Sequence, residues 1–309
     1  MVGLSPLQYP VRLFQRFAWP ASRSSFVSPA DFGLSPEPFI VVADDGLRIR
    51  GWTFLPADAW GVVILCHARG ASKSRTLAHA RLLWEQGLGV VTFDFRGCGD
   101  SDVPHRQMGG SLWDPLRDLE AVARYTESYV ADAPSLRGRV ALLGCSFGGN
   151  MAVAHAGTTG RRYPAVILDS TPLVRWVDML DDLLRKERRG ADFPRLRGLT
   201  DLVVARAVAT WTRAGPLYRH ARRSVRHLAG TRVLHIVGDR DTLFDIDESC
   251  RFLRADCAGS VEIFKVRRGR HLTNHLVDPD GYAERVTTCL SAAFGGSGRK
   301  EQHVRNNTG

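Results

Sequence analysis

The stretch LLGCSFGGNMAV, residues 142–153, sets an apolar run directly against a glycine-rich turn with one serine at its centre. Residues 144–148 of this stretch, Gly-Cys-Ser-Phe-Gly, match the pattern G-x-S-x-G. The pattern places a nucleophilic serine on a sharp turn between a strand and a helix, where close backbone packing favours glycine on both sides. Since the five residues join an apolar run to an alanine-rich helical segment, we predict that Ser146 is a nucleophile.

Segments typical of strands and of helices alternate on both sides of this turn. Apolar, β-branched runs predict buried strands, and segments of helical periodicity separate them. The alternation predicts an α/β fold with a mostly parallel twisted sheet and helices on both faces. The hairpin pattern of residues 39–56, with its Asp-Asp-Gly turn, predicts an antiparallel edge to this sheet. The other predicted strands cover 61–67, 88–97, 165–171, 231–241 and 260–266, and helices cover 75–87 and 113–130.

The predicted sheet does not use the whole chain. Residues 172–230 contain helical patterns without a convincing strand, far more chain than one crossover needs, and about twice as many basic as acidic residues. We interpret them as a helical cap inserted over the carboxyl ends of the strands. Residues 36–171 and 231–294 then form the core, residues 1–35 an N-terminal arm, and the polar residues 295–309 a disordered tail.

A serine hydroxyl is a poor nucleophile until a base takes its proton. With a nucleophile on this kind of turn, the acid and the histidine follow the serine at the ends of later strands, in that order. We predict that His271 is the general base and then the acid for the leaving group, and that Asp241 holds its tautomer. The alternatives within reach are Asp239, Asp245 and Asp247 for the acid and His275 for the base.

The oxyanion of a tetrahedral intermediate needs two backbone N–H donors. Phe147, directly after the serine, supplies one, and the loop CHARGAS, residues 66–72, supplies the other. In that loop Arg69 is the first choice and Ala68 the alternative. His67 lies on a different strand from the one expected for the base, so we assign it a loop-ordering role. Cys145 is interpreted as a packing residue, because a free cysteine behaves as a small hydrophobe.

Together with these residues, further motifs make the chain resemble the α/β-hydrolase superfamily from about residue 33 to 294. They are DDGLRIRGW (44–52), FDFRGCGDSD (93–102) and GDRDTLF (238–244). The opening DFGLSPEPFIVVADDGLRIRGWTFLP (31–56) is similar to serine-aminopeptidase-like and thioesterase or acyltransferase-like members, and Ala68 stands where the family usually has glycine. The resemblance implies cofactor-free hydrolysis through an acyl-enzyme, with the substrate bound between core and cap.

The sequence therefore predicts a serine hydrolase that cleaves a carboxylic ester or thioester through an acyl-serine intermediate. One alternative is an acyltransferase or thioesterase acting on a CoA- or carrier-linked acyl group, because an arginine-rich cap attracts phosphate. A catalytically silent binding protein with the same fold is another. We expect no cofactor and no metal, since the six cysteines show no CxxC pair and no histidine spacing suited to zinc.

The net charge of +10 would suit a nucleic-acid partner. Only four of the 42 basic residues are lysine, however, and a GC-rich coding sequence produces such an arginine excess without any partner. Because no nucleic-acid-binding motif is present either, we expect a small-molecule acyl ester or thioester substrate and no nucleic-acid partner. A homodimer and a weak contact of the N-terminal arm with a membrane surface stay open.

The expected location follows from three patterns. No apolar run reaches the length that a membrane-spanning helix needs, and the N-terminus lacks the pattern of a signal peptide. Several cysteines lie within apolar runs, as buried free thiols do. These patterns predict a cytoplasmic protein.

Overall fold

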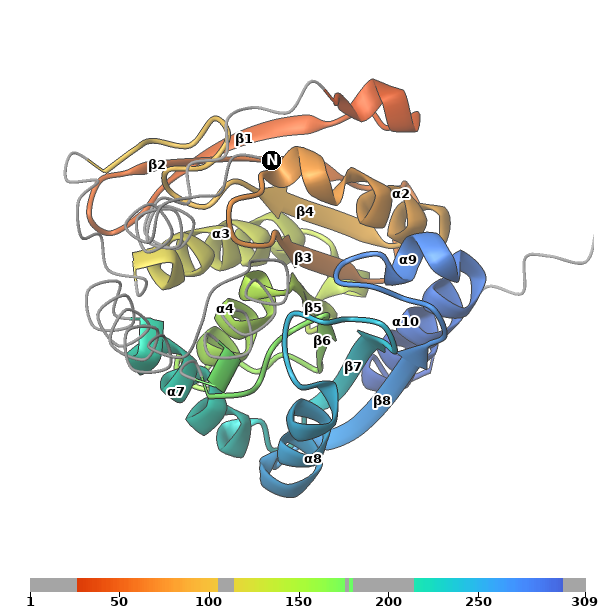
Figure 1. Ribbon diagram of the computed structural model, residues 1–309. Helices are drawn as coiled ribbons and strands as arrows, with labels where there is room; N and C mark the ends of the chain where they lie inside the picture. The colour runs from red at the N-terminus through yellow and green to blue at the C-terminus, as the bar shows by residue number, and fades with distance from the viewer. Residues whose placement is uncertain (1–26, 105–113, 176–177, 180–213, 297–309) are drawn as a thin grey trace, which may run out of the picture.

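The computed structural model describes residues 27–104, 114–175, 178–179 and 214–296. Eight strands form one sheet in the order β1-β2-β4-β3-β5-β6-β7-β8 (Figure 1). The pairings of β1 with β2 and of β2 with β4 are antiparallel, and the other pairings are parallel. The mostly parallel sheet with an antiparallel hairpin at its edge is thereby confirmed. The strands are β1 (Glu37–Val42), β2 (Arg48–Phe54), β3 (Val62–Cys66), β4 (Gly89–Phe93), β5 (Val140–Cys145), β6 (Ala165–Asp169), β7 (Arg232–Gly238) and β8 (Ser260–Val266).

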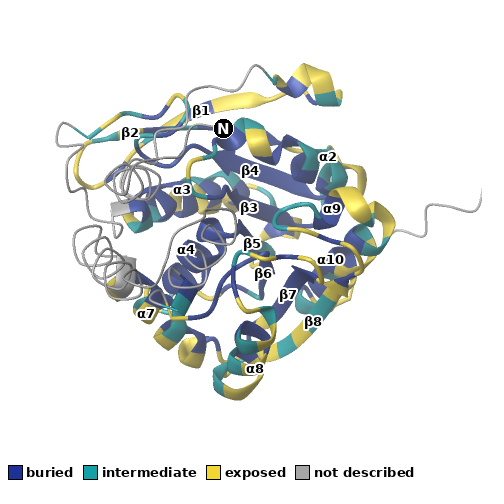
Figure 2. Ribbon diagram, viewed as in Figure 1, coloured by how far each residue is buried: buried dark blue, intermediate teal, exposed yellow. Residues whose placement is uncertain are grey.

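Helices cover both faces of the sheet. One face carries α2 (Leu77–Glu85) and α10 (Pro279–Ala293), and the other carries α3 (Asp114–Ala131), α4 (Phe147–Ala156), α7 (Ala214–Ser224) and α8 (Ile246–Asp256). Successive residues of a strand point to opposite faces. Accordingly Ile64 packs in one buried cluster with Leu119 of α3, and Leu65 packs in the other with Leu83 of α2. The central strands β3, β4 and β6 are buried at every position, which explains their continuous apolar sequences (Figure 2).

Much of the predicted cap, arm and tail lies outside the described residues, which exclude 1–26, 176–177, 180–213 and 297–309. Of the segment 172–230, the structure describes α7, which packs against α4 as a crossover helix between β6 and β7 does. The division of the chain into arm, core, cap and tail therefore stays a prediction. Across the described residues, no helix combines the length and the apolar character needed to cross a membrane.

The parallel strands bring distant loops to one edge of the sheet. β3, β5, β6, β7 and β8 run in the same direction, so their carboxyl ends meet at that edge. In an open α/β sheet, ligands bind at this edge. The turns and loops that follow these strands carry Ser146, Asp241 and His271.

Candidate active site

Ser146 lies on a strained turn between β5 and α4. Its backbone angles, φ 52° and ψ −113°, belong to a region that non-glycine residues rarely occupy. A Cβ at Gly144 would lie 2.3 Å from the Gly149 Cα, and a Cβ at Gly148 would lie 2.3 Å from the carbonyl oxygen of Cys66. The turn therefore requires glycine on both sides of the serine, which is the physical reason for the G-x-S-x-G pattern.

The structure brings Ser146 together with a histidine and an aspartate from later strands. The Nε2 atom of His271 lies 3.0 Å from the Ser146 Oγ, and its Nδ1 atom lies 2.7 Å from the Asp241 Oδ2. A carboxylate oxygen accepts hydrogen bonds, so the Nδ1–H of His271 donates to Asp241. That tautomer leaves the Nε2 lone pair facing the serine hydroxyl, as a general base requires.

A close backbone contact holds the Asp241 and His271 loops together. A Cβ on Gly238, at the end of β7, would lie 2.3 Å from backbone atoms of Gly269, in the loop after β8. The Asp241 side chain is fully buried, and its Oδ1 accepts the N–H of Leu243 at 2.9 Å. The His271 ring is 26% exposed, so it remains open towards the solvent side of the site.

The neighbouring carboxylates have structural partners of their own. Asp239 accepts a backbone N–H from the loop after β8, and Asp245 caps the N-terminus of α8. Asp247 forms an exposed ion pair with a lysine of β8. Of the four candidates for the acid, Asp241 is the one whose hydrogen bond to the imidazole is described.

His67 orders the loop after β3. Its Nδ1–H donates to the carbonyl of Ala68 at 2.8 Å, and its Nε2 accepts the N–H of Phe95 at 3.0 Å. Burial lowers the pKa of His67, in the direction that favours the neutral ring. Since both ring nitrogens are occupied, the geometry agrees with the loop-ordering role that its position suggests.

Cys145 and His275 both contact His79, a buried residue of α2. The Cys145 Sγ lies 3.9 Å from the His79 Nε2, and burial raises the pKa of this thiol well above its usual value. His275 belongs to the short helix α9 (Asn274–Val277), and its ring contacts the His79 ring at an angle of 39°, with 3.7 Å between centroids. Burial and the neighbouring His79 lower the pKa of His275 to about 3.

The start of α4, which carries Phe147, lies beside the loop after β3. Phe147 is the first residue of α4, so its N–H is one of the four that have no partner within the helix. Gly148 packs against the carbonyls of Cys66 and His67, and this contact brings the start of α4 beside the loop that holds Arg69. The assignment of the Phe147 and Arg69 N–H groups to the oxyanion stays a prediction.

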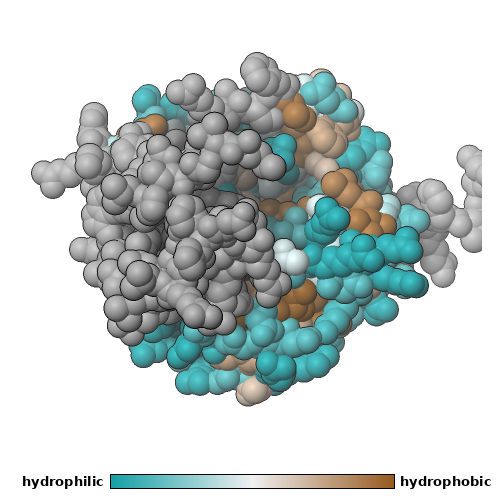
Figure 3. Space-filling view, in the orientation of Figure 1, coloured by the Kyte–Doolittle hydropathy of each residue, from teal (hydrophilic) through white to brown (hydrophobic). Residues whose placement is uncertain are grey.

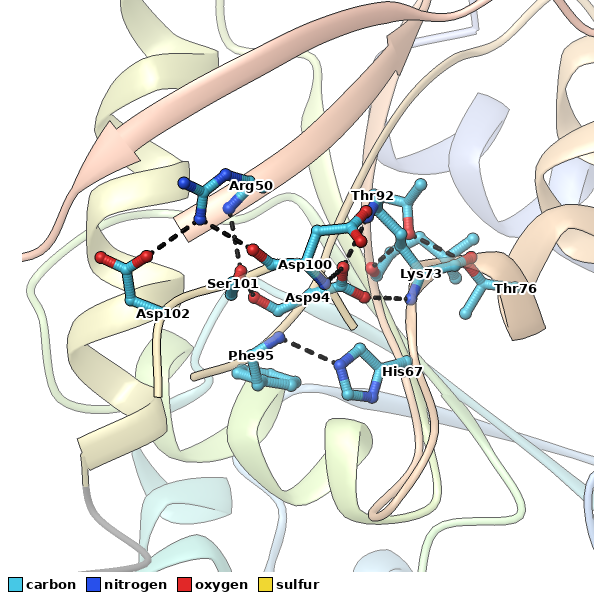
Figure 4. A network of polar contacts seen from close by, with 11 residues as sticks. Arg50, His67, Lys73, Thr76, Thr92, Asp94, Phe95, Asp100, Ser101 and Asp102 are labelled. Atoms are coloured by element: carbon cyan, nitrogen blue, oxygen red, sulfur yellow. Dashed lines mark hydrogen bonds and ion pairs between the residues drawn. The ribbon is translucent and has the colours of Figure 1, made fainter. Parts of the chain in front are cut away.

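A buried ion pair that sequence reasoning missed anchors the same loop (Figure 4). The backbone N–H of Lys73 donates to one oxygen of Asp94 at 2.6 Å, and its ammonium contacts the other at 2.5 Å. The Lys73 ammonium also contacts Asp100 and lies over the Trp52 ring. Both side chains of the central pair are buried, at 3% and 0% exposed. The scarcity of lysine in this chain was the one signal that could have singled out Lys73.

Replacing Lys73 by methionine is expected to lower the free energy of unfolding by about 3–5 kcal/mol, because the buried Asp94 carboxylate loses its counter-ion. Urea denaturation would measure the change. As a control, Arg226→Ala removes an exposed ion pair with Asp256 and is expected to cost about 1 kcal/mol or less. Equal effects of the two substitutions would contradict the anchoring role of Lys73.

His79, Asp169 and His275 form a buried cluster whose potential metal-ligating atoms lie within 4.8 Å of one another. The Asp169 Oδ2 already accepts hydrogen bonds from the His79 Nε2 and the Tyr282 hydroxyl, both at 3.1 Å. Two of the atoms that could bind an ion, the Asp169 Oδ2 and the His79 Nε2, are thus engaged with each other. The geometry therefore favours a hydrogen-bonded cluster over a metal centre.

Part of the surface towards α8 and α9 is hollowed and apolar (Figure 3). In the orientation of Figure 1, Figure 3 shows hydrophobic residues in a hollow beside the grey segments, towards α8 and α9. Near this edge the Phe244 ring meets the His271 ring edge-on, with 6.4 Å between centroids. The His271 ring thus has an apolar neighbour on one side.

The eight-stranded sheet and the serine turn at its edge define the class of protein. The sequence matches the Alpha/beta hydrolase family over residues 63–285, and the chain belongs to this family. Family membership supports hydrolase activity, and it agrees with the fold predicted from the sequence motifs.

Individual relatives share less with the chain. The YfhR protein of Salmonella typhimurium is 30% identical over 171 residues, which are 50% of this chain and 54% of YfhR. The chain thus spans about half the length of the curated relatives it matches. The Pyrococcus furiosus esterase Pf2001 superposes with a TM-score of 0.69 at 18% identity, covering 89% of this chain and 98% of that one. The esterase EaEST of Exiguobacterium antarcticum superposes with a TM-score of 0.56 at 19% identity, covering 82% of this chain and 98% of that one. These similarities show a shared fold.

Proposed function

We propose that the protein is a serine hydrolase that cleaves a carboxylic ester or thioester through an acyl-serine intermediate. The observation that carries this proposal is the pair of contacts made by His271, 3.0 Å to the Ser146 Oγ and 2.7 Å to the Asp241 Oδ2. A strained serine, an imidazole in the required tautomer and a buried carboxylate are the parts that acyl transfer needs.

In the proposed reaction His271 takes the hydroxyl proton as the Ser146 Oγ attacks the substrate carbonyl. The oxyanion of the tetrahedral intermediate accepts hydrogen bonds from the N–H groups of Phe147 and Arg69. The alcohol or thiol then leaves with the proton that His271 holds, and the acyl group stays on the serine. A water molecule, activated by the same imidazole, releases the acid. Asp241 keeps the tautomer of the ring throughout.

The choice of an ester as the first substrate has independent support. Structures of the same fold include proteins named as esterases, from Pyrococcus furiosus and Exiguobacterium antarcticum. The described neighbour of the His271 ring, Phe244, is apolar, which suits an acyl chain better than a charged group. Thioesters, including those of CoA, remain within the proposal because the acyl-serine chemistry is the same.

A fluorophosphonate probe tests the proposal directly. We expect the probe to label folded protein on Ser146, mapped by peptide mass spectrometry, and not to label heat-denatured protein. Cys145→Ala is the matched control: this neighbouring thiol packs behind the turn, so labelling is expected to persist in the variant. If folded protein with an intact circular dichroism spectrum takes up no probe, the chain is a binding protein and the proposal is wrong. The kcat/KM ratio of short aryl esters to acyl-CoA thioesters then ranks the two substrate classes.

A further inference from the structure

Asp169, the last residue of β6, is a fully buried carboxylate with four hydrogen-bond donors around it. Its Oδ1 accepts from the Ser170 hydroxyl at 3.0 Å and from the Asn274 Nδ2 at 2.7 Å. Its Oδ2 accepts from the His79 Nε2 and the Tyr282 hydroxyl, each at 3.1 Å. Ser170 is the next residue in the chain, and the other three donors come from α2, α9 and α10, so this carboxylate joins elements that are otherwise far apart in the sequence.

Hydrogen bonds connect the Oδ1 atom of Asp169 to the loop that carries His271. The Ser170 Oγ accepts the backbone N–H of Leu272 at 3.0 Å and the Nδ2 of Asn274 at 3.0 Å. Leu272 directly follows His271 in the sequence, and both Ser170 and Leu272 have positive φ angles, 51° and 60°. Such angles are unfavourable for these residues and persist only where the surrounding contacts impose them.

The main chain of Asp169 is hydrogen-bonded to the proposed nucleophile, Ser146. Its carbonyl oxygen accepts the N–H of Ser146 at 2.8 Å. A single residue thus bonds directly to the strained serine and, through Ser170 and Asn274, to the residues that follow the histidine. We therefore expect a shift of Asp169 to change the distance between the Ser146 Oγ and the His271 Nε2.

The charge of Asp169 sets the direction of these hydrogen bonds. Burial by itself would raise the pKa of Asp169, but the hydrogen bonds from His79 and Asn274 outweigh it and hold the pKa at about 2. The ionised carboxylate can only accept hydrogen bonds, so the Ser170 hydroxyl donates its proton to the hydrogen bond with Asp169. The lone pairs of the Ser170 Oγ then face Leu272 and Asn274, as their N–H groups require.

We propose that Asp169 is a positioning residue that, through Ser170 and Asn274, holds His271 at hydrogen-bonding distance from Ser146. The proposal rests on the proposed function, in which His271 is the general base. It assigns no chemical step to Asp169, which lies behind the site and does not reach the reacting atoms.

Asp169→Asn tests the proposal with little change in volume. A neutral amide oxygen accepts hydrogen bonds more weakly than the carboxylate that it replaces, so the Ser170 and Asn274 contacts would be weakened whichever way the amide is turned. We expect kcat for ester hydrolysis to fall about 10- to 100-fold, since misplacing a catalytic group by about 1 Å costs rates of that order. We expect KM to change less than about twofold, because Asp169 is buried away from any bound substrate. We also expect the downfield proton resonance of the hydrogen bond between His271 and Asp241 to broaden or disappear.

Two further variants serve as a second test of the proposal and as its control. Ser170→Ala removes the hydroxyl that links Asp169 to Leu272 and Asn274, and it is a smaller change. We expect it to lower kcat and to weaken the downfield resonance. If Asp169→Asn does not fold, this variant tests the proposal in its place. Tyr282→Phe removes a hydrogen bond from the other oxygen of Asp169, and we expect it to keep kcat within about twofold of wild type and to retain the resonance. Wild-type kcat in both the Asp169 and Ser170 variants, or an equal loss in Tyr282→Phe, would overturn the proposal. A wild-type protein without any ester or thioester turnover would instead contradict the proposed function, and the resonance would still report the position of His271.

Discussion

Replacing Ser146 by alanine is expected to lower kcat for ester hydrolysis by about 10⁴- to 10⁶-fold, because the acyl-serine intermediate can no longer form. The remaining activity would come from binding and from the oxyanion donors alone. KM is expected to change little, since the hydroxyl is one small group that points towards His271. Steady-state kinetics on a short aryl ester would measure both constants.

The fold of this variant is not expected to change. Alanine can adopt the same backbone conformation as Ser146, so the free energy of unfolding should stay within about 1 kcal/mol of wild type. Cys145→Ala serves as the kinetic control, because its side chain lies in the buried cluster of α2 and α10. Substantial activity in folded Ser146→Ala protein would show that the nucleophile is a different residue.

Asp241→Asn is expected to lower kcat by about 10⁴-fold while the protein stays folded. An asparagine can present its NH2 to the His271 Nδ1, which would move the imidazole proton to Nε2. The proton would then face the Ser146 hydroxyl, and the ring could not act as a base. The same aryl-ester assay measures the effect, and a thermal unfolding curve confirms that the fold is retained.

The neighbouring acids provide matched controls for this substitution. Asp239→Asn and Asp247→Asn change the same functional group within six residues of Asp241, but their carboxylates face a backbone N–H and Lys265. We expect each to retain kcat within about threefold of wild type. If one of them lost activity as severely as Asp241→Asn, the acid would have been assigned to the wrong residue.

The strands of this fold were predictable because their pattern is local. A strand buried on both faces needs a continuous apolar run, and the runs at 61–67 and 165–171 coincide with β3 and β6. The Asp-Asp-Gly turn likewise placed the hairpin of β1 and β2 correctly. Helix ends were less well predicted: the pattern at 75–87 begins inside a short 3₁₀ turn (Lys73–Thr76), whereas α2 runs from Leu77 to Glu85.

The polar anchors behind the site could not be predicted in this way. Lys73 lies 21 residues from Asp94, and Asp169 lies 105 residues from Asn274. A charged residue at the end of an apolar run looks the same in the sequence whether it is exposed or buried with a partner. Only the folded sheet shows that these carboxylates lose their contact with water and need several donors.

The sequence alone determined that Ser146 occupies a strained turn, because that turn is built from neighbouring residues. Strand, glycine, serine, glycine and helix follow one another within residues 142–153, so no distant contact has to be known. The tertiary structure decided which carboxylate meets His271. Asp239, Asp241, Asp245 and Asp247 are close in sequence, and the contact between Gly238 and Gly269 together with the direction of each side chain selects Asp241. Such a selection depends on how β7 and β8 lie beside each other, which the order of residues does not contain.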